Sequence, residues 1–356
     1  MFLKTWICGA FLLALVFTAE SSFARSDTVV NTLPGNTFDS SYITGYTGLL
    51  TARLFLLFQN ASLFVNPGSE RISKISYRPN VNVRVGIAGF WKWFGLGLSI
   101  ENPFYKTDQD TYGKTNTLDL RVNAFGRYVA GEFFFQQYHG FYINSPEGPG
   151  DKHYIIPDMQ TLSLGIAGYW IYNAKRFSIR AAYIQNECQK KSAGSLVVRP
   201  SFLYYRISSA HGIIPAEFVD NYLIPYENLI SGGDFYSVGL SPGYVYTLVF
   251  LKHCYLTAAA FPGVAAQFSS WRNDVKSSNG FEFSLQLNAR IALGYNSGKW
   301  FLGGSAQTGF NEVPNQMSNA LFGYDVAQVR VWGGMRFDFF RKKKRTPLEE
   351  ARKMCE

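Results

Sequence analysis

Apolar and polar residues alternate over long stretches of this chain. From residue 281 to residue 296, odd positions are apolar and most even positions are polar, in the run FEFSLQLNARIALGYN. A period of two places the two sets on opposite faces of a β-strand. Strands of soluble proteins average about five or six residues, whereas a tilted strand that crosses a membrane needs about 9–11. The run therefore predicts a membrane-spanning strand with its apolar face toward lipid.

Similar alternation recurs along the chain, separated by connections of two kinds. It is found at residues 81–88, 118–125, 177–183 and 329–338. Tight turns flanked by aromatic residues fall near 91–94, 128–131, 172–175, 251–253 and 296–299, and longer polar connections lie at 66–71, 103–115, 144–158, 270–279 and 311–324. In outer-membrane barrels the short turns face the periplasm and the long loops face outside, with aromatic girdles at the rims. The pattern predicts an all-β fold, a transmembrane antiparallel up-and-down β-barrel.

The number of strands is constrained by the position of the two ends of the barrel. A direct reading gives about thirteen strands, but bacterial barrels of this kind have an even number. Between the turns near 173 and 252 three candidate strands compete for two places, at 176–187, 195–207 and 233–250. We predict about twelve strands and treat part of 188–232 as a long outer excursion, and fourteen strands is the alternative.

The two ends of the chain have their own signals. Lys4, an apolar run over 6–17 and the small residues Ser22 and Ala24 predict a cleaved signal peptide over 1–24. Residues 25–50 are expected to form an N-terminal lead or small plug, 51–340 the barrel and 341–356 a basic periplasmic tail. The last strand ends on Phe337, Phe339 and Phe340, aromatic residues that we expect the outer-membrane assembly machinery to read. These features predict the outer membrane of a Gram-negative cell, with its lipid as the other partner.

Composition and charge agree with a wall that faces lipid. Aromatic residues make up 17% of the chain and charged residues 17%, whereas soluble domains carry about a quarter charged residues. The net charge is +9, and residues 341–356 contribute +4 of it, with seven basic and three acidic side chains. No basic stripe interleaved with aromatic residues is present, so nucleic-acid binding is not predicted. We place Cys188 near the outer rim and Cys254 in a periplasmic turn, and expect both to be free thiols, too far apart to be bridged.

Several segments resemble a known family. They are Ile75–Asn80 (ISYRPN), Lys175–Glu187 (KRFSIRAAYIQNE), Gln189–Ser195 (QKKSAGS), Pro242–Thr247 (PGYVYT) and Gly294–Asn296 (GYN). Over roughly residues 40–340 the chain resembles the Bacteroidota outer-membrane family called domain of unknown function 4421 (DUF4421), with Cys188 standing where that family tends to have an aromatic residue. The resemblance implies an outer-membrane barrel and supplies no activity.

The sequence offers little catalytic or metal-binding chemistry. The four histidines, His139, His153, His211 and His253, include no pair at metal-ligand spacing. Only His139 falls on a predicted strand, and no serine can be placed beside it. We therefore predict no catalytic residue, no metal, no cofactor and no enzymatic activity.

Charged residues on the inward face are the main candidates for function. The predicted lumen-lining residues are Arg84, Arg121, Arg127, Arg180, Glu282, Arg290, Arg330 and Arg336. Rings of fixed charge set selectivity in pores, so an arginine-rich lumen would favour anions. Alternatively these arginines pair with inward acids and amides and fill a closed barrel, because buried charges are normally paired and twelve strands leave a modest interior.

Three functions follow from these observations. The first is a narrow porin-like or transport barrel for small solutes, anions among them. The second is a non-conducting barrel that serves as an envelope structural or interaction protein. The third is a lipid-modifying outer-membrane enzyme.

Overall fold

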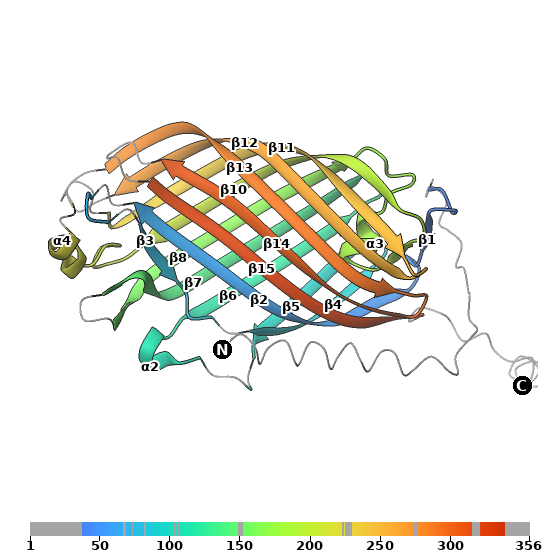
Figure 1. The fold of residues 1–356 in the computed structure, drawn as a ribbon, viewed down its shortest axis with the longest axis horizontal. Helices are drawn as coiled ribbons and strands as arrows, with labels where there is room; N and C mark the ends of the chain where they lie inside the picture. The colour runs from blue at the N-terminus through green and yellow to red at the C-terminus, as the bar shows by residue number, and fades with distance from the viewer. Residues whose placement is uncertain are drawn as a thin grey trace, which may run out of the picture.

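The computed structural model describes residues 38–338 except 67–68, 73, 82, 103, 105–106, 149–151, 223, 225–229, 273–276 and 315–320. The predicted signal peptide and basic tail lie outside the described residues. The described chain forms a closed antiparallel β-barrel (Figure 1). Its elements are β1 (Ile43–Gly45), β2 (Leu50–Asn66), β3 (Ile75–Arg78), β4 (Arg84–Trp91), β5 (Phe94–Glu101), α2 (Gln109–Tyr112), β6 (Asn116–Phe125), β7 (Val129–Gly148), β8 (Lys152–Ile171), α3 (Ile179–Tyr183), β9 (Glu187–Gln189), β10 (Ala193–Ser208), α4 (Ala216–Tyr222), β11 (Gly232–Phe250), β12 (Cys254–Arg272), β13 (Ser277–Asn296), β14 (Trp300–Pro314) and β15 (Leu321–Phe337).

Each wall strand pairs with its neighbours, and β15 closes the barrel by pairing with β2 from Leu321–Asn66 to Phe337–Leu50. β3 and β4 together make one wall strand, because β2 pairs with β3 near one end and with β4 near the other. The break between them contains Pro79, which lacks the N–H that a ladder needs. The barrel therefore has twelve strands, as the sequence predicts.

The side chains of the wall alternate as the period of two requires. On β13 the outward Phe283 and Leu285 are 72% and 77% exposed, whereas the inward Ser284 and Gln286 are buried. Exposed apolar side chains also occur on the other wall strands, so the outer face of the wall is apolar. No helix among the described residues is long and apolar enough to cross a membrane.

The two ends of the barrel differ as the turns predict. The tight turns join β4 to β5 and β11 to β12, and they lie at the end where β2 begins and β15 ends (Figure 1). We call this the inner end, and the end with the long connections, α2 and α4 the outer end.

One predicted strand is wrong. Residues 176–187 do not form a strand of the wall. The wall strand in this part of the chain is β10, Ala193–Ser208. Within 176–187, Ser178 caps the short helix α3, its Oγ accepting a hydrogen bond from Ala181 N at 3.1 Å. The helix is buried all round, including Arg180, because it lies inside the barrel. A short apolar run with every side chain buried shows no period that separates a strand from a helix.

The insertion that disturbs the strand parity therefore lies at the inner end, before residue 193. There β9 pairs with β1, with Thr44 opposite Cys188, and Asp39 N donates to Lys175 O at 2.9 Å. We call residues 38–46 together with 173–189 the inner plug. Only 209–231, with α4, forms the outer excursion; 193–208 belongs to the wall.

The prediction that Cys188 lies near the outer rim is also wrong. Its Sγ lies 3.2 Å from the carbonyl oxygen of Asn296, at the inner end of β13. Cys254 begins β12 and pairs with Tyr295 at the same end. Both thiols are free, as expected. The reason is not that they lie at opposite ends of the barrel, because both lie at the inner end.

Two apolar clusters fill the ends of the lumen. At the outer end, inward residues of β2, β3, β7, β8, β10, β11 and β12 pack with Ile213, Ile214, Phe218 and Val219 of the excursion. At the inner end, inward residues of ten wall strands pack with Phe177, Ile179 and Ile184 of the inner plug. The inner cluster joins strands from all around the wall and therefore crosses the lumen, whereas the outer cluster packs the excursion against the arc of the wall from β2 through β7 to β12. We call the described residues of 209–231 the outer cap.

Candidate functional site

Charged and amide side chains, which we call the charged belt, form several groups inside the barrel. Arg290 of β13 donates from Nη1 and Nη2 to the two carboxylate oxygens of Glu132 on β7, at 2.8 and 2.7 Å. The hydroxyl of Tyr169 on β8 joins the pair, accepting from Arg290 at 2.6 Å and donating to Glu132 at 2.8 Å. Four strands separate β7 from β13 in the sheet order, so this ion pair spans the lumen.

A second carboxylate, Asp119 of β6, gathers two of the predicted arginines. Arg121 Nε lies 3.2 Å from its Oδ1 and Arg84 Nη1 lies 3.5 Å from its Oδ2. Gln136 Nε2 donates to the same Oδ2 at 2.8 Å. The carboxylate therefore accepts hydrogen bonds from Arg121 on β6 and Gln136 on β7 and forms an ion pair with Arg84 on β4.

The third carboxylate, Glu187 of the inner plug, is fully buried. Arg127 from the wall approaches it at 2.5 Å and Arg180 of α3 at 3.1 Å. Ser178 Oγ donates to its other oxygen at 2.5 Å. Arg180 and Ser178 hold Glu187 within the plug, and Arg127, from the turn between β6 and β7, ties the plug to the wall.

Arg336 fixes the plug in another way. It is 2% exposed, and its guanidinium donates to the carbonyl oxygens of Gln185 and Ser297 and to Asn296 Oδ1. A cation held by carbonyl oxygens ties β15 to the plug and to the turn after β13.

The structure thus brings the predicted residues into separate groups rather than a single ring. Arg84 and Arg121 share Asp119, Arg127 and Arg180 share Glu187, and Arg290 pairs with Glu132. We predicted that Arg180 lies on a wall strand, but it lies on α3. Glu282 lies inward and half-buried on β13, opposite Gln267 in the β12 register.

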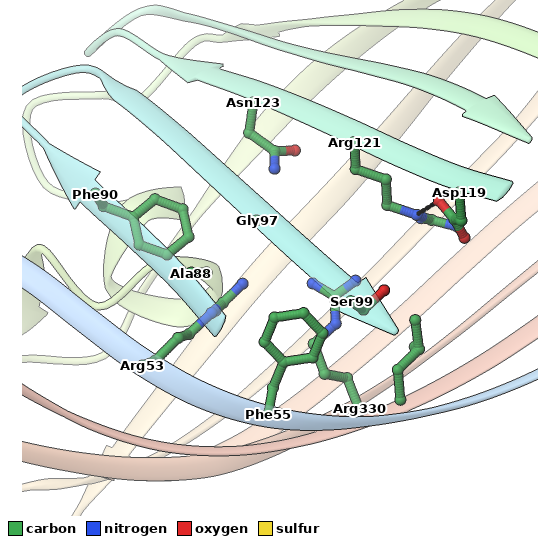
Figure 2. A pocket seen from close by; sticks show the side chains of 11 residues that line it. Arg53, Phe55, Ala88, Phe90, Gly97, Ser99, Asp119, Arg121, Asn123 and Arg330 are labelled. Atoms are coloured by element: carbon green, nitrogen blue, oxygen red, sulfur yellow. Dashed lines mark hydrogen bonds and ion pairs between the residues drawn. The ribbon is translucent and has the colours of Figure 1, made fainter. Parts of the chain in front are cut away.

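Arg330 lies apart from these ion pairs, in a pocket (Figure 2). Its guanidinium stacks over the Phe55 ring at 5.1 Å. The pocket leaves about 20 Å³ for the centres of water molecules, which is room for one or two waters. Its lining residues are Arg53, Phe55, Leu57, Ala88, Phe90, Gly97, Ser99, Asp119, Arg121, Asn123 and Arg330.

Sequence reasoning missed Arg53, Glu132 and Glu187. Arg53 has the same alternation signal as the other arginines, since Thr51, Arg53 and Phe55 occupy the inward positions of β2. Glu132 was missed because its partner is far away in sequence, Arg290 being 158 residues from it. Glu187 was missed because it lies in the inner plug, where we predicted a wall strand.

At the outer end, His211 and Asp158 form a pair that deserves comparison with hydrolytic sites. His211 Nδ1 lies 3.2 Å from Asp158 Oδ2, and the same oxygen accepts hydrogen bonds from Ser209 Oγ at 2.9 Å and from Ala210 N at 2.7 Å. A nucleophilic serine would have to contact the histidine, but this serine contacts the aspartate. The carboxylate therefore anchors the start of the outer cap. Among the described residues, no group of three His, Cys, Asp or Glu side chains could hold a metal ion.

Several solved structures are similar to this chain. The outer membrane protease OmpT from Escherichia coli is 9% identical, with a TM-score of 0.32 over 83% of this chain and 98% of that one. The translocator domain of the autotransporter NalP from Neisseria meningitidis is 8% identical, with a TM-score of 0.34 over 94% and 98%. The toluene transporter TodX of P. putida is 8% identical, with a TM-score of 0.28 over 83% and 91%. Similarity this low carries no information on function.

No curated protein matches the sequence. The family model described as domain of unknown function (DUF4421) matches residues 37–329, which include every group of the charged belt described above except Arg330 and Arg336. The chain belongs to the DUF4421 family.

Proposed function

We propose that the protein is a closed, non-conducting barrel of the outer membrane that serves as a structural or interaction protein of the envelope. One observation carries this proposal: the inner plug and the outer cap each pack into an apolar cluster with the inward faces of wall strands, one at each end of the barrel. A solute that followed the barrel axis would have to displace both. The outward apolar surface and the aromatic residues at the inner rim support a place in the membrane.

The arrangement of the arginines gives the proposal its second support. In a pore that selects anions, fixed cations face water in the conducting path. Here Arg290, Arg127 and Arg121 each lie against a carboxylate of the protein itself. Each of these three arginines is neutralised by its carboxylate, and the Arg290–Glu132 pair holds opposite walls together, which suits a filled interior better than a selective path. Transport of small solutes stays the alternative function, and it requires both closures to move.

Conductance of the purified protein in a planar bilayer tests the proposal. We expect no current steps above the bare bilayer, with a porin reconstituted in parallel as the positive control. Steady single-channel currents with anion preference would contradict the proposal. The alternative predicts that replacing Arg290 and Arg330 with Ser weakens such a preference.

The proposal contains no catalytic step. The His211–Asp158 pair anchors the outer cap and lacks a contacting nucleophile. Incubation of the purified protein with phospholipid and lipid A, followed by mass spectrometry, tests this point. Turnover that disappears in His211→Ala would favour the enzyme instead.

A further inference from the structure

The barrel wall has a seam between β5 and β6. These two strands pair only between Phe94–Gly97 and Arg121–Ala124, although β4 pairs along the whole of β5 and β7 along the whole of β6. The strands meet again where Thr117 Oγ1 donates to Glu101 Oε1 at 3.1 Å. The seam, residues 98–100 and 118–120, is about 10 Å long at roughly 3.3 Å per residue. Unpaired strand edges are costly in hydrocarbon, so the wall opens most easily here.

The pocket that contains Arg330 lies directly behind this seam. The side of the pocket that faces the seam is formed by Gly97 and Ser99 of β5 and by Asp119 and Arg121 of β6 (Figure 2). The side chains that β5 contributes are absent or small, so little of β5 stands between the seam and the pocket. A group that entered between the strands would reach the pocket at once.

The pocket carries more positive than negative charge. Arg53, Arg121 and Arg330 line it against a single carboxylate, and that carboxylate, Asp119, is already shared by Arg121 and Arg84. In the described part of the chain no carboxylate lies within ion-pair distance of Arg53 or Arg330.

The two remaining guanidinium groups are incompletely satisfied. Arg53 is 6% exposed, and it donates from Nη1 to the carbonyl oxygen of Tyr183 at 2.8 Å. Its Nε, and that of Arg330, are buried without a hydrogen-bond partner. Buried charges are costly unless paired, so the pocket has the composition of an anion-binding site.

The surroundings of the seam are apolar on both sides. Inside, the rings of Phe55 and Phe90 form part of the pocket wall. Outside, leucine and isoleucine side chains border the seam and face the lipid, with exposed fractions of 53%, 67%, 56% and 37% for Leu98, Ile100, Leu118 and Leu120. An amphiphile could place its charged end in the pocket and leave its chain along these residues.

We propose that the pocket binds the carboxylate of a single-chain amphiphile, which enters from the lipid phase through the seam between β5 and β6. Guanidinium groups bind carboxylates through paired hydrogen bonds. The small volume of the pocket favours a carboxylate over a bulkier phosphodiester. The inference goes beyond the proposed function and does not depend on it, because the site is reached from the side of the barrel and not along its axis.

Binding of a fluorescent 16-carbon fatty acid to the full-length protein in detergent tests the charge requirement. We expect Arg330→Gln to weaken binding at least tenfold, because Arg330 makes no hydrogen bond that the fold needs in the described structure. Arg199→Gln is the matched control: Arg199 is inward but lies outside the pocket, with Nε 3.4 Å from Tyr169 Oη. The fatty-acid methyl ester should compete poorly with the labelled fatty acid. An equal loss of fatty-acid binding in Arg330→Gln and Arg199→Gln would overturn the proposal.

Sodium acetate as a competitor distinguishes a lipid-borne carboxylate from a free small anion. We expect millimolar acetate to leave fatty-acid binding unchanged. If acetate competes as well as an unlabelled fatty acid, the site takes small carboxylates and the amphiphile proposal fails.

Filling the pocket gives a test that does not alter charge. A Cβ at Gly97 would meet no atom closer than 3.5 Å, so Gly97→Val should fold and occupy part of the pocket. A Cβ at Gly89, on the neighbouring β4, would meet nothing within 4 Å, and Gly89→Val is the control. We expect binding to fall at least tenfold in Gly97→Val alone; binding unchanged in both would remove the pocket as the site.

Closing the seam tests the route. Leu98→Cys with Leu120→Cys, in a background with Cys254 and Cys355 replaced by Ser, permits a disulfide or a short bismaleimide bridge across the seam. Leu96→Cys with Val122→Cys bridges the paired part of the same strands and is the control. Bridging the seam should slow fatty-acid uptake at least tenfold, and uptake should recover on reduction of the disulfide. Uptake at the control rate would show that the ligand enters elsewhere. Ion conduction with the binding pattern intact would refute the closed barrel and leave this site standing.

Discussion

Glu132 and Arg290 form a bidentate ion pair across the lumen, with N–O distances of 2.8 and 2.7 Å. The arginine side chain is 12% exposed and the glutamate side chain 24%. The pair joins opposite walls, and neither the inner plug nor the outer cap contributes a carboxylate to it. It follows that removing one partner leaves the other charge inside the barrel without its ion-pair partner.

Arg290→Ala should therefore destabilise the barrel by about 3–5 kcal/mol, the usual cost of breaking a buried pair on one side. Urea unfolding followed by the gel shift of the unheated protein measures this. The double variant Arg290→Met, Glu132→Leu should regain most of the loss, since it leaves no unpaired charge. A double variant as unstable as Arg290→Ala would show that packing, and not pairing, dominates here.

Glu187 holds the inner plug through Arg127, Arg180 and Ser178. Glu187→Ala leaves two arginines facing each other, so we expect the plug to loosen by about 3 kcal/mol, which is roughly a hundredfold faster amide exchange. Hydrogen exchange followed by mass spectrometry should show the change in peptides covering 176–190 and not in β12 or β13. Glu187→Gln keeps the hydrogen-bond acceptor and should change exchange less.

Phe218 is fully buried in the outer cap and lies edge-on to Tyr154, with ring centroids 5.7 Å apart. Phe218→Ala should weaken the cap by about 3–5 kcal/mol through the cavity it leaves. Limited proteolysis of the protein in vesicles should then cleave within 209–231 faster than in the wild type. Cleavage at the wild-type rate would mean that the cap is held by its backbone and not by this ring.

The two closures act in series, so neither change alone should produce current. We expect conductance in planar bilayers only from Phe218→Ala combined with Glu187→Ala. Current from either single variant would show that the other closure does not seal the lumen.

Cys188 and Cys254 should differ in reactivity. Burial raises the pKa of the Cys188 thiol, so at neutral pH it holds less of the reactive thiolate than an ordinary cysteine, whereas Cys254 is partly exposed. In a Cys355→Ser background, iodoacetamide at pH 8 should label Cys254 at least tenfold faster, as read by peptide mass spectrometry. Because the thiolate fraction of Cys188 rises only near its elevated pKa, the gap should narrow as the pH rises. Equal labelling at pH 8 would show that the inner plug opens freely.

The sequence by itself determined the wall. A period of two over long runs such as 281–296 requires strands with one apolar face, and only a closed barrel can satisfy their backbone groups in lipid. The same alternation is the ground on which we predicted an inward direction for Arg84, Arg121, Arg290 and Arg330, because on a strand the direction of a side chain follows from its position.

The tertiary structure decided what fills the barrel. Residues 176–187 form part of a plug and not a strand. The wall encloses this segment and buries the apolar and polar side chains of α3 alike, so the pattern of these residues does not distinguish a helix from a strand. The partners of the arginines were also beyond the sequence: Glu132 meets Arg290, and Glu187 meets Arg127, only because closure of the sheet brings distant strands and an inserted segment face to face. Pairing across a lumen depends on strand order, tilt and register together, and none of these is contained in the spacing of the residues that pair.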